Sequence, residues 1–261
     1  MSTEHEAPPG PGAGPRLLVV EHEADCPPGW MGEWLSAAGA HLDVRRPYRG
    51  DTLPATLDDH DGMVVLGGSM GPDDDAAYPW LGGVKDLIRG AARDATPVLG
   101  ICLGHQLAAV ALGGVVHRNP LGKQIGTPPI GWLRAAAQDR LLGGLTTARI
   151  GVQWNQDVVH EIPAGARVLA RTERMEIQAA WFGSRVWGVQ WHPEAGADIV
   201  RRWVEGNPDG ARETGLDLPA ALGEIEAAEA ELRTAWQPLA AGFAKLCRRS
   251  PGEGAVVKGQ W

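Results

Sequence analysis

Three short, almost wholly apolar runs constrain this 261-residue chain more than any other feature. They are RLLVV at 16–20, GMVVLGG at 62–68 and TPVLGI at 96–101. A strand with one solvated face alternates apolar and polar residues, whereas a parallel strand is covered on both faces and is apolar throughout. The three runs therefore predict the centre of a parallel sheet.

Segments with helical spacing separate these runs. After the first run, Met31, Trp34 and Leu35 lie on one helical face and Gly39 fits a helix end. A second helical face follows the second run, and HQLAAVALGG follows the third. HLDVRRP at 41–47 alternates as a further strand. This strand–helix order predicts an α/β fold with right-handed crossovers and helices on both sides of the sheet.

The second half of the chain has a different pattern. Between residues 115 and 190, short apolar segments are separated by turns, and the last of them is RVWGVQWH at 185–192. These segments predict antiparallel strands added to the sheet. From residue 197 apolar residues again recur at spacings of 3, 4 and 7, and Pro238 is expected to kink or break that helix.

These patterns divide the chain into three parts. Residues 1–15 are rich in Pro, Gly and Glu and are expected to be a disordered tail. Residues 16–196 are expected to form one domain around an open, mostly parallel twisted sheet flanked by helices. Residues 197–261 are expected to form a helical extension packed on the same domain.

Composition excludes several classes of function. The chain has 24 Lys and Arg against 32 Asp and Glu, so its net charge of −8 argues against binding to nucleic acid or to an anionic membrane. No apolar run approaches the roughly 20 residues that span a bilayer. The N-terminus lacks the basic and apolar regions of a signal peptide. We expect a soluble, cytoplasmic protein.

The cysteines do not suggest a disulfide framework or a metal site. Cys26, Cys102 and Cys247 are odd in number and far apart, and there is no C-x-x-C pair. EHEADC at 21–26 is interpreted as a solvated acidic patch that follows the first strand. We expect no metal and no cofactor.

Cys102 lies at the carboxyl end of the third apolar run, where active sites of open parallel sheets gather. Gly100 and Gly104 flank it, and small residues at these positions allow a tight strand-to-helix turn that presents a nucleophile. The following helix N-terminus would stabilise a thiolate. Free cysteines are also common in cores, so position alone leaves a buried structural cysteine as the alternative.

A thiol nucleophile requires a base and a group that orients the base. His192 ends an apolar strand in WGVQWHPE at 187–194, and Glu194 follows it across a proline that stiffens the turn. The pair is therefore a candidate base and orienting carboxylate for Cys102.

GICLGHQ at 100–106 and GVQWHPE at 188–194 together resemble the class I, triad-type glutamine amidotransferase family. VVLGGSMG at 64–71 resembles the family's oxyanion loop, and the resemblance covers roughly residues 16–195. It implies a flavodoxin-like sheet and the catalytic triad Cys102, His192 and Glu194. It further implies oxyanion-hole N–H groups on Gly68 and Leu103, with Gly67 and Gln106 in contact with substrate.

One segment departs from the family pattern. Where relatives would have a segment similar to Trp-His-Gly-Asp, this chain has Trp154-Asn155-Gln156-Asp157. Because this region of the family holds the substrate backbone, Gln153, Trp154 and Asn155 are expected to line the site. Trp154 fits a core aromatic equally well.

The resemblance implies hydrolysis of the glutamine side-chain amide through a cysteine thioester, giving glutamate and ammonia for an acceptor enzyme. A stand-alone hydrolase of γ-glutamyl amides or peptides is the first alternative, and a regulatory subunit with a vestigial triad is the second. The chain has no G-x-x-x-x-G-K-[ST] phosphate loop. A separate ammonia-accepting synthetase subunit is therefore an expected partner, beside glutamine or a γ-glutamyl compound.

Overall fold

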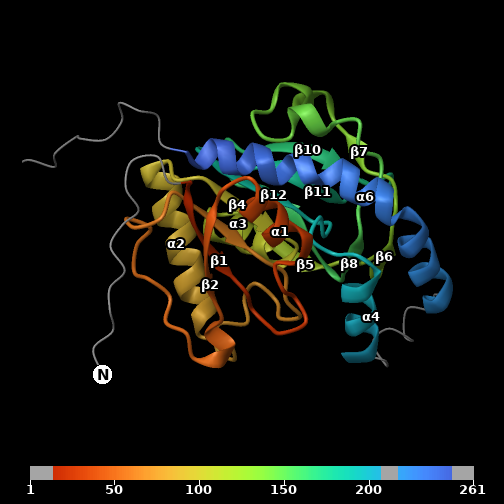
Figure 1. The fold of residues 1–261 in the computed structure, drawn as a ribbon, viewed down its shortest axis with the longest axis horizontal. Coiled ribbons are helices and arrows are strands. Elements are labelled where there is room, and N and C mark those ends of the chain that lie inside the picture. Colours follow the sequence, from red (N-terminus) through yellow and green to blue (C-terminus); the bar gives the residue numbers. More distant parts are fainter. Residues whose placement is uncertain (1–13, 207–216, 249–261) are drawn as a thin grey trace, which may run out of the picture.

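The computed structural model describes residues 14–206 and 217–248. Eight strands form one sheet in the order β2-β1-β3-β4-β12-β11-β10-β7 (Figure 1). The half from β2 to β12 is parallel, and the half from β12 to β7 is antiparallel. This confirms the predicted mostly parallel α/β sheet with added antiparallel strands.

The strands of the large sheet are β1 (Arg16–Val20), β2 (His41–Arg45), β3 (Gly62–Val65), β4 (Val98–Ile101), β7 (Gly131–Trp132), β10 (Arg167–Arg171), β11 (Ile177–Trp181) and β12 (Val186–Val189). Two small antiparallel sheets pair β5 (Val115–Arg118) with β9 (Asp157–Glu161) and β6 (Gln124–Gly126) with β8 (Gln153–Asn155). The α-helices are α1 (Gly29–Ala37), α2 (Trp80–Asp94), α3 (Leu103–Ala111), α4 (Ala197–Gly206) and α6 (Leu218–Cys247), and the 3₁₀ turns are η1 (Pro47–Arg49), η2 (Arg134–Gln138) and η3 (Gly143–Leu145). Within the described ranges, no helix is long and apolar enough to cross a membrane.

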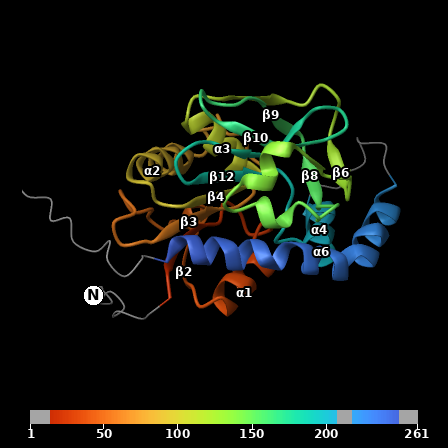
Figure 2. The ribbon, with the colours of Figure 1, turned by 90° about the horizontal axis from the view of Figure 1, so that it is seen from above.

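Helices cover both faces of the sheet, as the apolar runs predict (Figure 2). Alternate residues of β1 separate into two cores: Leu17 and Val19 pack with α1 and α6, whereas Leu18 and Val20 pack with α2 and α3. The same period-two separation continues along β3, β4 and β12. The carboxyl ends of β3, β4 and β12 consequently share one edge of the sheet.

Two predictions about the second half of the chain are wrong. β12 is not simply an added antiparallel strand, because it pairs in parallel with β4 and in antiparallel only with β11. β5 does not join the large sheet and pairs with β9 instead. A short apolar segment bounded by turns carries no information about the direction of its neighbours, so its sequence could not decide either point.

α6 continues through Pro238, so the proline, which was expected to kink or break the helix, does not break it. Proline removes one backbone hydrogen bond of a helix. In α6 the residues before and after the proline are held by the core, since Trp236, Leu239 and Phe243 are fully buried beneath the helix. α6 also packs against α1 and α4. Tertiary packing therefore outweighs the local cost of the proline.

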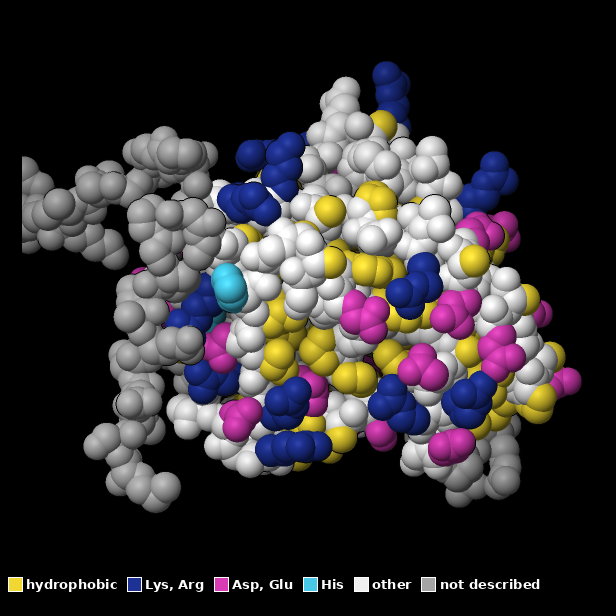
Figure 3. All heavy atoms as spheres, viewed as in Figure 1, with side chains coloured by type: hydrophobic (Ala, Val, Ile, Leu, Met, Phe, Trp, Pro, Cys, Tyr) yellow, Lys and Arg dark blue, Asp and Glu magenta, His cyan; other side chains and the backbone are white. Residues whose placement is uncertain are grey.

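Charged side chains of both signs are intermixed on the face that carries α1, α4 and α6 (Figure 3). Arg201 pairs with Glu226, and Arg233 pairs with Glu33. On this face the basic side chains do not gather into one patch. The disordered tail predicted for residues 1–15 falls almost wholly outside the described residues, which begin at residue 14.

Candidate active site

Cys102 lies between the end of β4 and the start of α3. It has φ 50° and ψ −105°, a conformation that costs energy for any residue with a Cβ. Its N–H donates to the Val189 carbonyl oxygen at the end of β12, at 2.9 Å. The neighbouring strand thus holds the strained turn, and the side chain is 5% exposed.

The flanking glycines are required by close backbone contacts. A Cβ on Gly100 would lie 2.3 Å from the Gly104 carbonyl oxygen, and one on Gly104 would lie 2.1 Å from the Val65 carbonyl oxygen. The first turn of α3 therefore packs directly on β3 and β4, where no side chain fits. This close packing is the physical reason for the G-x-C-x-G pattern around the thiol.

His192 follows β12, so the parallel pairing of β12 with β4 brings it beside Cys102. Its Nδ1 lies 2.7 Å from Glu194 Oε1, and the two side chains are 3% and 1% exposed. The His192 N–H donates to the Val152 carbonyl oxygen at 2.7 Å. The Trp30 N–H donates to the Glu194 carbonyl oxygen at 3.0 Å. Both residues of the turn are therefore anchored through their backbones.

Burial opposes protonation of the His192 ring, but the charges of Cys102 and Glu194 outweigh it and raise the pKa of His192 well above its ordinary value. Gly67 packs against His192 and Cys102. A Cβ there would lie 2.9 Å from His192 Cε1 and 3.6 Å from Cys102 Cβ. The thiol, the imidazole and the Gly67 backbone therefore converge at one point.

Gly68 and Leu103, the predicted oxyanion-hole residues, lie next to each other. A Cβ on Gly68 would lie 3.0 Å from Leu103 Cδ2. Leu103 is the first residue of α3, so its N–H is among those at a helix N-terminus that have no intrahelical acceptor. The structure thus brings the glycine loop after β3 and the start of α3 to the same side of Cys102.

Cys102 and His192 open onto a cavity of about 600 Å³. Gly68, Gln106, Trp154 and Asn155 of the predicted set also line it. Glu194 does not line it and lies buried behind the imidazole. The volume lies within the ~300–1,000 Å³ range of small-molecule sites.

Gln153, which was expected to line the site, does not line the cavity. Its side chain is buried in β8 and donates to Gln178 Oε1 of β11. Gln153 is only 1% exposed and stays outside the cavity lining, because its amide is used within the small sheets and β11. Trp154 combines the two roles considered for it, since it lines the cavity and also packs against the core.

Gln106 and Asn155 are tied to one backbone carbonyl. Gln106 Nε2 donates to the Asp157 carbonyl oxygen at 2.9 Å, and Asn155 Nδ2 donates to the same oxygen at 3.2 Å. Asn155 Oδ1 is buried and has no hydrogen-bond partner among the described residues. An acceptor at the cavity wall is therefore available to a donor on a ligand.

Sequence reasoning missed several residues of the site. Gln190, inside the GVQWHPE motif, donates from Nε2 to Cys102 Sγ at 3.5 Å. Trp203 of α4 lines the cavity with its ring centroid 4.6 Å from that of His192. Only the motif pointed to Gln190, and nothing in the local sequence distinguished Trp203 from a core tryptophan.

The interpretation of EHEADC as a solvated acidic patch is correct only in part. Asp25 is exposed and Glu23 is half-buried, whereas Glu21 and His22 are buried. The loop begins at the carboxyl end of β1, at the same sheet edge as Cys102, and Glu23, Asp25 and Cys26 line the cavity. Among the described residues, no group of three or more His, Cys, Asp or Glu side chains is placed to hold a metal ion.

Known proteins are similar to this chain in sequence and in fold. The family described as "Glutamine amidotransferase class-I" matches residues 33–199. The glutamine amidotransferase-like protein YfeJ of Salmonella typhimurium is 30% identical over 193 residues, covering 73% of this chain and 80% of that protein. A subunit of the glutamine-hydrolysing GMP synthase of Methanosarcina barkeri is 34% identical over 199 residues, covering 73% of this chain and 95% of that protein.

Gamma-glutamyl peptidase 5 of Arabidopsis thaliana is 29% identical over 203 residues, covering 72% of this chain and 75% of that protein. Among solved structures, a glutamine amidotransferase from Thermotoga maritima superposes with a TM-score of 0.79 at 26% identity, covering 89% of this chain and 99% of that one. Sequence and fold therefore agree on the family.

Proposed function

The chain belongs to the class I glutamine amidotransferase family, and we propose that it cleaves the γ-amide bond of glutamine or a related γ-glutamyl compound through a covalent Cys102 intermediate. One observation carries the proposal. A thiol on a strained turn shares a cavity with an imidazole that is hydrogen-bonded to a buried carboxylate.

In the first half of the reaction, the Cys102 thiolate attacks the γ-carbon of the amide. The negative charge that develops on the amide oxygen is stabilised by the N–H groups of Gly68 and Leu103. The carbon–nitrogen bond then breaks, and the leaving nitrogen takes a proton from His192. The raised pKa of His192 supports this role, since the ring holds a proton to donate at neutral pH.

In the second half, water attacks the γ-glutamyl thioester and gives a proton to His192. The carbon–sulfur bond breaks, which releases glutamate and restores the Cys102 thiolate. Glu194 holds the ring orientation through Nδ1 and stabilises the imidazolium in both halves. Cys102 forms no disulfide, as a thiol nucleophile requires.

Two fates of the leaving group fit the family. Similarity to a glutamine-hydrolysing GMP synthase subunit favours a glutaminase that passes ammonia to a separate synthetase. Similarity to a gamma-glutamyl peptidase, together with the 600 Å³ cavity, favours a hydrolase with a larger leaving group as the second candidate. The triad chemistry is the same for both.

The experiment that tests the proposal is labelling with a diazo-ketone analogue of glutamine, followed by peptide mass spectrometry. We expect one adduct, on Cys102, and none in Cys102→Ala. The same variant should lose glutamine hydrolysis by about 10⁴-fold or more, because the covalent route is removed. Cys247→Ala, which alters a cysteine of α6, serves as the control and should label normally.

An unlabelled wild-type protein, or persistent hydrolysis in a folded Cys102→Ala variant, would show that Cys102 is not the nucleophile. Such a result would favour a regulatory role for the domain.

A further inference from the structure

The cavity wall next to His192 is aromatic and acidic. Trp203 lies against the imidazole, and its Nε1 donates to the Asp25 carbonyl oxygen at 2.7 Å. The Trp154 ring lies 5.9 Å from that of Trp203. These contacts join α4, β8 and the loop after β1 into one continuous surface, which also contains Glu23.

The carboxylates of this wall are not neutralised by neighbouring cations. Glu23 accepts hydrogen bonds from Ser69 Oγ at 2.7 Å and from Cys26 Sγ at 3.3 Å. Neither Glu23 nor Asp25 forms an ion pair with another residue of the described ranges. The wall therefore presents two negative charges to the cavity.

A second wall, built by the small sheets, carries both signs of charge. Arg118 and Asp157 are register partners in the β5–β9 pair, and Lys123 also lines the cavity. Asn155 contributes its unpartnered Oδ1. The glutamyl part of any γ-glutamyl substrate ends in an ammonium and a carboxylate. The cations of this wall can pair with the substrate carboxylate. The Asp157 carboxylate and Asn155 Oδ1 can accept hydrogen bonds from the substrate ammonium.

The chemistry assigns the remaining wall to the leaving group. His192 must donate its proton to the nitrogen that departs, so the departing group lies on the His192 side of the γ-carbon. Trp203 is in contact with the His192 ring and is hydrogen-bonded to the backbone carbonyl of Asp25, and both residues line the cavity. The aromatic and acidic wall is consequently the surface that the departing group meets.

We propose that the leaving group is an alkyl amine that carries a second, positively charged amino group, so that the substrate is a γ-glutamyl monoamide of a diamine or polyamine. This inference rests on the proposed function and specifies its substrate. The indole rings of Trp154 and Trp203 cover the methylene chain and attract the cation, and Glu23 and Asp25 pair with its charge.

Other leaving groups fit this wall less well. Ammonia, released from glutamine, is too small to reach the rings and both carboxylates. A leaving group with a carboxylate, such as the remainder of a γ-glutamyl peptide, would be repelled by Glu23 and Asp25.

The test compares three γ-glutamyl amides of matched length. One is made from butane diamine with a single amino group acylated, one from pentylamine and one from an aminopentanoate. We expect kcat/KM for the diamine amide to exceed that for the pentyl amide by about tenfold, as a cation–π contact and a partly exposed ion pair would give. The aminopentanoate amide should be the poorest of the three.

Glu23→Gln/Asp25→Asn should lower the ratio between diamine and pentyl amides severalfold, leaving only the part contributed by the two indole rings. The control, Asp59→Asn/Glu231→Gln, removes two exposed carboxylates that do not line the cavity and should keep the wild-type ratio. Equal kcat/KM for the diamine and pentyl amides in the wild type, or an unchanged ratio in Glu23→Gln/Asp25→Asn, overturns the inference.

The two proposals fail in different ways. If Cys102-dependent hydrolysis occurs but the diamine amide is not preferred, only the substrate assignment is wrong. If a folded wild-type protein cleaves neither glutamine nor any of the three amides, the proposed function itself is overturned.

Discussion

At the level of single residues, His192 is the most constrained side chain of the site. Glu194 binds its Nδ1, Trp203 covers one side of the ring, and the Val152 carbonyl oxygen holds its backbone. The tautomer and direction of the ring are therefore set before substrate arrives. Such preorganisation fits the role proposed for His192, which gives a proton to the leaving nitrogen and takes one from water.

Glu194→Gln should lower kcat by about 10³–10⁴-fold, since the imidazolium loses its partner. Burial already opposes protonation of the ring, and the charges of Cys102 and Glu194 raise the pKa of His192 against it. Removing one of these charges must lower that pKa. Because the proton donor exists only below the pKa, the alkaline fall in kcat should move to lower pH.

Two measurements check this prediction: the pH dependence of kcat and the titration of ¹³C-labelled His192 by NMR. Glu205→Gln, an exposed carboxylate on α4, is the matched control and should shift neither. An unchanged alkaline limb in Glu194→Gln would contradict the role assigned to the carboxylate.

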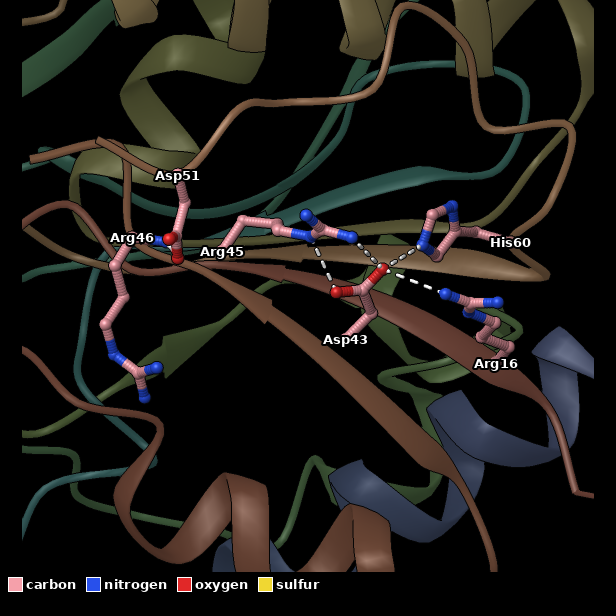
Figure 4. A network of polar contacts seen from close by, with 6 residues as sticks. All are labelled: Arg16, Asp43, Arg45, Arg46, Asp51 and His60. Atoms are coloured by element: carbon pink, nitrogen blue, oxygen red, sulfur yellow. Dashed lines mark hydrogen bonds and ion pairs between the residues drawn. The ribbon is translucent and has the colours of Figure 1, made fainter. Parts of the chain in front are cut away.

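At the level of elements, the edge strand β2 is held by an ion network centred on Asp43 (Figure 4). Asp43 accepts hydrogen bonds from Arg45 at 2.7 Å and from Arg16 of β1 at 3.2 Å. His60 Nε2 lies 3.0 Å from the same carboxylate. The network ties β2 to β1 and to the loop before β3, so it fixes the edge strand to the rest of the sheet.

Asp43→Asn should therefore destabilise the fold by about 1–2 kcal/mol. Burial raises the pKa of Asp43, but hydrogen bonds from Arg45 and His60 outweigh it and lower this pKa from 3.8 to about 2. The folded pKa is below the unfolded one, so the contribution is present above pH 3.8 and is lost as pH falls through about 2.

Urea unfolding at pH 7 and at low pH measures both effects. The difference between wild type and Asp43→Asn should shrink as the pH approaches 2. Asp58→Asn, on the exposed loop before β3, is the control and should cost little at either pH. A pH-independent difference would mean that the Asp43 charge contributes nothing.

At the level of the whole molecule, α6 closes the core that lies behind the candidate active site. Trp236 is fully buried, with its ring 4.9 Å from Trp191, and its Nε1 donates to the Ile150 carbonyl oxygen at 3.2 Å. Trp191 directly precedes His192. The C-terminal helix therefore supports the turn that carries the imidazole, although it contributes no residue to the cavity within the described ranges.

Trp236→Ala should lower the free energy of unfolding by about 3–5 kcal/mol, because it leaves a large cavity and an unpaired carbonyl. Trp236→Phe keeps most of the apolar contact and should cost considerably less. Chemical denaturation of both variants measures the difference. A loss below about 1 kcal/mol in Trp236→Ala would show that α6 is not part of the cooperative unit.

Much of the fold was predictable because its signals are local. The apolar runs predicted β1, β3 and β4, and helical spacing predicted α1, α2 and α3, since burial on two faces or on one stripe determines the pattern of neighbouring residues. The direction of β12, the separate β5–β9 pair and the unbroken α6 were not predictable. Each depends on partners distant in sequence.

The sequence by itself determined the family, the type of sheet and the turn at Cys102, because tight turns and buried strands impose short-range requirements on residue type. Only the tertiary structure decided that β12 lies beside β4 and so joins His192 to Cys102. It also placed Glu23 and Asp25 at the cavity, set Trp203 against the imidazole and buried Gln153 outside the cavity lining. The physical reason is that strand order and loop direction are selected by the packing of the whole core, which no local pattern records.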